Sequence, residues 1–178
     1  MSDQATTTPQ PDAQDCAAMA ATTEAHERFK PFVGTFNAEV KMWMGPGDPM
    51  VSSGTMKNSL ELGGRYLQQV YEGDDNPNDP FPGFAGRGYW GYNTVDNRYE
   101  GFWIDTACTF MMTEQGQVDS SGKVWEMKGE MTDPSSGQPM RKRSVVTLKD
   151  KDRHSMEMFF EGPDGNEFKA MEINYTRA

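Results

Sequence analysis

From residue 34 onward, apolar and polar side chains alternate along the chain in short segments. Clusters of Gly, Pro, Asn and Asp separate these segments, and this combination is typical of β-strands joined by turns. In the last segment Met171, Ile173 and Tyr175 share one face, whereas Glu172 and Asn174 share the other. The pattern predicts ten strands, at about residues 34–44, 51–61, 64–73, 85–93, 98–105, 108–118, 123–131, 139–149, 153–161 and 166–177.

Ten strands with one apolar face each must bury those faces together, because no helices intervene to cover them. Most of the breaks are short and rich in turn residues, as in Ser120-Ser121-Gly122, so neighbouring strands are expected to pair in sequence order. Sandwiches with Greek-key topology need longer crossovers. The sequence therefore predicts an all-β fold, an antiparallel up-and-down barrel of about ten strands.

The segment before the first strand has a different character. Residues 1–22 are rich in Ala, Thr, Gln and Pro without an apolar period, and we expect a disordered tail there. A short helix is predicted from Glu24 to Phe32, with Thr22 or Thr23 as N-cap and Pro31 near its end. Residues 23–178 would then form the barrel domain, with the helix as a plug and the loop 74–82 over one mouth.

Several short motifs resemble those of a known family. They are His26 to Phe36, Lys41 to Met44, Gly63 to Leu67, Gly88 to Asn93, Gly101 to Asp105, and the ending from Gly162 to Arg177. Together they are similar to the bacterial domain-of-unknown-function family numbered 1579, over about residues 24–177. Phe36 stands where that family often has Trp. The resemblance implies a calycin-like (lipocalin-like) barrel and no established activity. The architecture is also similar to that of haem-binding nitrobindin-type barrels.

Charge and composition exclude several classes of partner. The formal net charge is −10, with 27 acidic against 17 basic residues, so neither nucleic acid nor an anionic membrane surface is an expected partner. Mean hydropathy is −0.78, and no apolar run is long enough to cross a membrane as a helix. The N-terminus lacks the features of a signal peptide, and Cys16 and Cys108 do not suggest a disulfide, so a cytoplasmic location is expected.

Sites for metals and catalysis find little support. Two histidines and two cysteines without ligand spacing do not make a zinc site, and no cofactor is predicted. The acidic stretch 74–79 lacks the spacing of a calcium loop. Haem needs only one protein ligand, so His154, which shares a face with Met156, is kept as an alternative ligand, although a rim position is the simpler interpretation. No nucleophile motif is present.

The aromatic residues and methionines suggest a cavity instead. Fourteen methionines and four tryptophans suit either a packed core or a cavity that accepts apolar guests, and a ten-stranded barrel is wide enough for both. The candidate lining residues are Phe36, Trp43, Trp90, Tyr92 and Trp103, with Arg87 as a polar anchor and Asp105 as its possible carboxylate partner. A solvent-facing Arg87, or an Arg–Asp pair between strands, is the structural alternative.

These observations lead to one main hypothesis and two alternatives. The main hypothesis is a barrel that binds a small apolar or amphipathic molecule in its interior; binding is favoured over catalysis, and whether the chain is an enzyme stays open. In the first alternative the pocket is catalytic, with Asp105 or His154 as acid or base. In the second the domain is a structural or partner-binding module that acts through an edge or its tail. The sequence predicts no particular oligomeric state.

Overall fold

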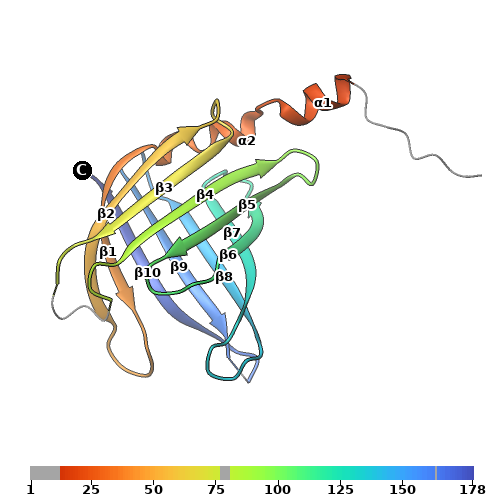
Figure 1. Ribbon diagram of the computed structural model, residues 1–178. Helices are drawn as coiled ribbons and strands as arrows, with labels where there is room; N and C mark the ends of the chain where they lie inside the picture. The colour runs from red at the N-terminus through yellow and green to blue at the C-terminus, as the bar shows by residue number, and fades with distance from the viewer. Residues whose placement is uncertain (1–12, 77–80, 163) are drawn as a thin grey trace, which may run out of the picture.

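Ten antiparallel strands form a closed barrel in the computed structural model, which describes residues 13–76, 81–162 and 164–178 (Figure 1). Each strand pairs with its neighbours in sequence, and β1 pairs with β10 to close the ring. The strands are β1 (Gly34–Met42), β2 (Met50–Glu61), β3 (Tyr66–Gly73), β4 (Ala85–Asn93), β5 (Arg98–Asp105), β6 (Met112–Val118), β7 (Val124–Thr132), β8 (Pro139–Leu148), β9 (Arg153–Glu161) and β10 (Glu167–Arg177).

The predicted fold and its ten strands are confirmed, with one clear difference in bounds. The sixth strand was expected from residue 108 and begins at Met112. The carboxylate of Asp105 explains the delay, since its Oδ1 accepts hydrogen bonds from the backbone N–H groups of Ala107 and Cys108, at 2.9 and 3.1 Å. Such a turn holds the backbone donors locally and keeps them out of the strand ladder.

Alternation along the strands sorts the side chains between the interior and the solvent. In β1, Phe36, Ala38 and Val40 are buried, while Asn37 and Glu39 are exposed. The register places Ala38 opposite Gly54 on β2 and Tyr175 on β10. The small Ala38 therefore stands beside Tyr175, and Gly54 leaves the space that the Tyr71 side chain occupies, so the interior of the barrel packs tightly near this seam.

The N-terminal segment contains more structure than the sequence suggested. Residues Ala13–Ala20 form the helix α1, although we predicted a tail without structure over residues 1–22. Ala has the highest helix propensity, and this stretch carries four alanines, which accounts for the helix. The helix is exposed and reaches the barrel through the carbonyl of Ala20, which accepts a hydrogen bond from Arg65 Nε at 2.9 Å. Residues 1–12 lie outside the described residues.

A short plug follows α1 and closes one end of the barrel. It consists of α2 (Glu24–Glu27), which begins after Thr23, and a 3-10 turn, η1 (Lys30–Phe32). Phe29 and Phe32 are 0 and 3 % exposed and pack edge-on against Tyr99 and Trp125, respectively. Burial of each phenylalanine contributes about 1.5–3 kcal/mol to stability. The predicted plug is therefore present, although it is two short turns rather than one helix.

Polar contacts to the backbone hold the plug in place. The buried Asn58 amide donates to the carbonyl oxygen of Phe32 at 2.9 Å, and the Tyr99 hydroxyl donates to that of Ala25 at 3.1 Å. Both acceptors belong to the ends of short helical turns, whose carbonyls have no partner within the turn. The barrel wall supplies those partners.

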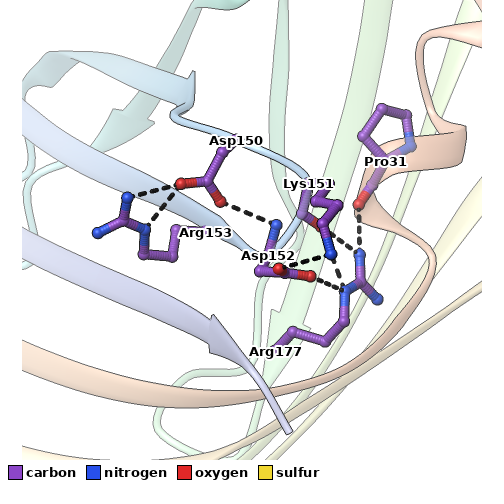
Figure 2. Close-up of polar contacts among 6 residues, drawn as sticks. All are labelled: Pro31, Asp150, Lys151, Asp152, Arg153 and Arg177. Carbon is purple, nitrogen blue, oxygen red and sulfur yellow. Dashed lines mark hydrogen bonds and ion pairs between the residues drawn. The ribbon is translucent and has the colours of Figure 1, made fainter.

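Arg177, near the end of β10, ties the plug to the last strand and to the turn 149–152. Its Nη1 and Nη2 donate to the carbonyls of Val33 and Pro31 at 2.8 and 3.0 Å, and Nη2 also donates to that of Lys151 at 2.8 Å. The guanidinium carbon lies 4.5 Å from the centre of the Phe36 ring. Figure 2 shows this guanidinium between Pro31 and the 150–153 turn, whereas Arg153 is paired with Asp150 away from the plug.

The opposite end of the barrel carries the turns 43–49, 74–84, 106–111, 133–138 and 162–166, of which residues 77–80 and 163 lie outside the described residues. We predicted that the loop 74–82 covers one mouth, and its residue Phe81 does line the cavity described below. Half of the acidic stretch 74–79, which we compared with a calcium loop, lies outside the described residues, at 77–79.

We expect Arg177→Met to destabilise the protein by about 2–3 kcal/mol, because it removes a charged donor from three carbonyls while the methylene stem is kept. The matched control is Arg153→Met, which removes only an ion pair whose arginine side chain is 63 % exposed and should destabilise the protein much less than Arg177→Met. Urea unfolding measures both, and hydrogen exchange of residues 24–33 should accelerate only in Arg177→Met. Equal losses in the two variants would contradict this role of Arg177.

Candidate functional site

The barrel encloses a cavity of about 300 Å³. It extends from Phe32 of the plug, past the inner faces of the strands, to Phe81, Phe84 and Ala107 at the opposite mouth. Six methionines line it, at positions 42, 56, 112, 156, 158 and 171. This volume is at the lower end of the range for small-molecule sites.

The two tryptophans of the cavity wall come from adjacent strands. Trp90 on β4 and Trp103 on β5 both line the cavity, so both face inward. Each is paired with a glycine of the other strand, Trp90 with Gly101 and Trp103 with Gly88. The Trp103 ring lies over Gly86 and Gly88, where any side chain would collide with it. The glycines of β4 thus make the space that the indole occupies.

Asp105 fixes the position of Trp103. Its Oδ2 accepts a hydrogen bond from Trp103 Nε1 at 3.0 Å, while its Oδ1 accepts the two backbone N–H groups of the following turn. This carboxylate therefore lines the cavity with three donors already directed at it. Its contacts orient an aromatic wall residue and shape one side of the mouth.

A charged cluster lies on the inner wall beside these tryptophans, on the strands β6 and β8. Lys142 Nζ on β8 donates to Glu114 Oε2 on β6 at 2.8 Å, and the Ser144 hydroxyl donates to the same oxygen at 3.1 Å. The side chains of Lys142 and Glu114 are 9 and 10 % exposed, and all three residues line the cavity. An ion pair removed from water to this extent depends on such additional hydrogen bonds.

Sequence reasoning missed this cluster, although the signal was present. Lys142 is two and four positions before Ser144 and Val146, and Glu114 is two positions after Met112. Each charged residue therefore shares a strand face with residues that point inward. The basic run 141–143 lies in an alternating strand and is too short to form a basic patch for a polyanion. Its members separate instead, since Arg141 and Arg143 face outward and pair with Glu161 and Glu167.

His154 lies at the base of the cavity and is only 4 % exposed, so the rim position favoured from the sequence is wrong. Its ring stacks on Tyr175, with 4.3 Å between centroids, and meets the edges of Phe36 and Phe32. Burial, with smaller effects of Arg177 and Lys149, lowers the pKa of His154 to about 4. The imidazole is therefore neutral at pH 7.

The surroundings of His154 do not fit a haem ligand. A metal-bound histidine normally donates its second ring N–H to an acceptor, which sets the orientation of the ring. His154 Nδ1 is buried without a hydrogen-bond partner among the described residues, and aromatic rings hold the imidazole instead. Among the described residues, no group of three or more His, Cys, Asp or Glu could hold a metal ion.

The structure brings together only part of the predicted site. Trp90, Trp103 and Asp105 line the cavity. Phe36 and Tyr92 face inward but are packed into the core, Phe36 against His154 and Tyr92 against Tyr99.

Arg87 and Trp43 lie outside the cavity, which corrects their predicted positions. Arg87 has the opposite alternation to Trp90, and it donates to Glu72 Oε1 at 2.5 Å on the outer surface. The structural alternative of a solvent-facing arginine is thus the correct one. Trp43 follows the end of β1, and its ring lies 5.9 Å from the Lys169 ammonium.

The comparisons with known proteins agree with this architecture. A family model described as "Protein of unknown function (DUF1579)" matches residues 21–177, so the chain belongs to that family, as the motifs had indicated. Among curated protein sequences, none matches this chain. No helix in the described part of the chain is long and apolar enough to cross a membrane.

Solved structures share the fold at low sequence identity. The crystal structure of Rv2717c from M. tuberculosis is 12 % identical with a TM-score of 0.62, and the alignment covers 89 % of this chain and 99 % of that one. A redesigned beta barrel is 14 % identical with a TM-score of 0.43, covering 89 and 98 % of the two chains. EF1p2_mFAP2b bound to DFHBI is 12 % identical with a TM-score of 0.41, covering 86 and 99 %. The likeness to Rv2717c shows a common fold.

The buried His154 predicts a specific dependence of stability on pH. Its folded pKa of about 4 lies below the ordinary value of 6.5, so between these values the unfolded chain binds a proton that the folded protein does not. Stability should therefore fall as the pH decreases from 6.5 toward 4. By pH 4.5 the loss due to this residue should be on the order of 2–3 kcal/mol.

His154→Phe should remove this dependence, because phenylalanine can pack between Phe36 and Tyr175 without titrating. Urea unfolding at pH 7.5, 6.0 and 4.5 gives the difference in the free energy of unfolding between the two proteins. His26 and the carboxylates contribute equally to both proteins, so their contributions cancel. If the difference in the free energy of unfolding did not change with pH, His154 would have the same pKa in the folded and the unfolded protein, and this prediction would be wrong.

Proposed function

We propose that this member of the DUF1579 family binds a small, mainly apolar molecule with one polar end inside its barrel. The observation that carries the proposal is the cavity of about 300 Å³ inside the barrel, whose lining joins methionines and tryptophans to the buried polar cluster of Glu114, Lys142 and Ser144. Sites for small molecules combine these features: a concave apolar surface and a few polar groups that fix orientation.

The plug and the mouth support a binding role. Phe32 seals one end of the cavity, and the contacts of Asn58 and Arg177 with the plug backbone hold it there. A guest would then enter through the opposite mouth, between Phe84 and Ala107. The methionines suit this task, because their flexible and polarizable side chains adapt to guests of different shape.

The contacts of the acidic and basic groups favour binding over catalysis. Asp105 already accepts three hydrogen bonds, and Glu114 accepts two at one oxygen. His154 is enclosed by aromatic rings. A general acid or base must instead reach the proton that it transfers. These groups shape the cavity and orient the side chains that line it, as the polar groups of a binding site do.

The first test is native mass spectrometry of the protein as purified, with an absorbance scan through the visible range. We expect a bound mass of a few hundred daltons or less, and its fragmentation gives the chemical class. For protein that carries no guest, titration with 1-aminoanthracene, a neutral fluorophore that brightens in apolar surroundings, is expected to saturate at one probe per chain.

A cavity-filling variant locates that binding. Val40→Phe adds a ring at a cavity-lining position that is 7 % exposed, and it should weaken 1-aminoanthracene binding at least tenfold. Val51→Phe is the matched control, because Val51 is 56 % exposed on the neighbouring strand. Equal affinity in the two variants, or no saturable binding in the parent protein, would contradict the proposal.

A further inference from the structure

The charged cluster inside the cavity depends on a gap in the strand between its members. Glu114 is on β6 and Lys142 on β8, so β7 runs between them. The β7 residue opposite Lys142 is Gly129, and a side chain there would collide with the backbone of Thr113 beside Glu114. The missing side chain lets the two charges meet over β7 and keeps the pair at the cavity surface.

The pair leaves little room for a further charge. Lys142 and Glu114 neutralise each other, and both are largely removed from water. A carboxylate that approached Lys142 would also approach Glu114, and the apolar surroundings would screen the repulsion weakly. An incoming ammonium would meet Lys142 in the same way. A third charge in this cavity would therefore lack a partner, which is costly in an apolar site.

The rest of the lining does not supply a partner for an anion. Asp105 adds a negative charge near the mouth, and His154 is neutral at pH 7. The arginine that we predicted as an anchor, Arg87, is paired with Glu72 on the outside. No arginine lines the cavity among the described residues, so the bidentate contact that usually holds a carboxylate is missing from this lining.

The cluster does offer hydrogen bonds to an uncharged group. An ammonium has three N–H bonds, and Glu114 Oε2 accepts one from Lys142. The Ser144 hydroxyl donates to the same carboxylate oxygen, which leaves the lone pairs of the serine oxygen as acceptors. A group that both accepts from Lys142 and donates to Ser144 would complement the two residues.

From these contacts we infer that the cavity selects an uncharged molecule whose polar end is a hydroxyl or a carboxamide, and rejects the carboxylate of the same length. The inference rests on the proposed function, since it specifies what the cavity binds. Glu114 and Lys142 are the residues that set the specificity, and Ser144 completes the polar site.

Competition at pH 7.5 tests the inference in the wild-type protein. Octan-1-ol, octanamide, octanoate and octylammonium have comparable chains and differ in the polar end, and each is titrated against bound 1-aminoanthracene. We expect the alcohol and the amide to displace the probe at concentrations at least tenfold lower than octanoate and octylammonium. If 1-aminoanthracene itself does not bind, the proposed function fails; if it binds and either ion competes as well as the alcohol, only this inference fails.

A charge-changing variant then assigns the selectivity to the pair. Glu114→Gln keeps an oxygen that accepts from Lys142 and Ser144 but leaves the ammonium without a countercharge, so octanoate should bind at least tenfold more tightly than in the wild type. The readout is the ratio of octanoate to octanol affinity, which should rise at least tenfold because only the ion meets the changed charge. The double variant Glu114→Gln/Lys142→Met restores a neutral cluster and should reject octanoate again.

Near-ultraviolet circular dichroism shows whether each variant is folded before its affinities are compared. The wild-type competition requires no variant and decides the inference by itself if Glu114→Gln does not fold. Folded Glu114→Gln protein with unchanged octanoate affinity would show that Glu114 does not exclude anions.

Discussion

The pairing of β1 with β10 is the constraint on which the remaining structure depends. It removes the last free edges and fixes the number of strands in the ring at ten. An eight-stranded barrel is just wide enough for side chains to fill its interior, so ten strands enclose more volume than one layer of side chains occupies. The excess must be taken up by large side chains, by inserted chain or by a cavity, and this barrel uses all three: the tryptophans and methionines, the plug and the space of about 300 Å³.

The two ends of the barrel divide these tasks. At the plug end, Phe29, Phe32 and Trp125 fill the interior, and Arg177 fastens the plug backbone to the last strand. Towards the mouth the wall is lined by methionines, and Asp105 holds Trp103 upright over a glycine-lined part of β4. Rigid packing at one end lets the other end stay hollow, because closure of the ring no longer depends on filling the whole interior.

Local pattern was enough to predict the barrel, because alternation and turn residues act within a few positions of the chain. The same rule assigns Arg87 to the outer face, and our misplacement of it came from grouping it with Trp90, which has the opposite alternation. Alternation also predicts that Lys142 and Glu114 face inward. It does not predict their contact, since these residues are 28 positions apart and meet only over the β7 glycine of a closed ring. The enclosure of His154 likewise depends on Phe36 and Tyr175 from the seam strands.

The presence of the Lys142–Glu114 pair is difficult to explain by stability. Well-packed apolar residues of similar volume in place of a buried ion pair are often neutral or stabilising, because two desolvated charges recover little more than they lose. Six methionines around the same cavity show that apolar residues are accommodated in this wall. A pair that is costly to bury, faces an open space and is supported by Ser144 is explained more simply by recognition of a polar group in that space. The chemistry of the guest would then be set by a place in the barrel wall where packing alone would have favoured different residues.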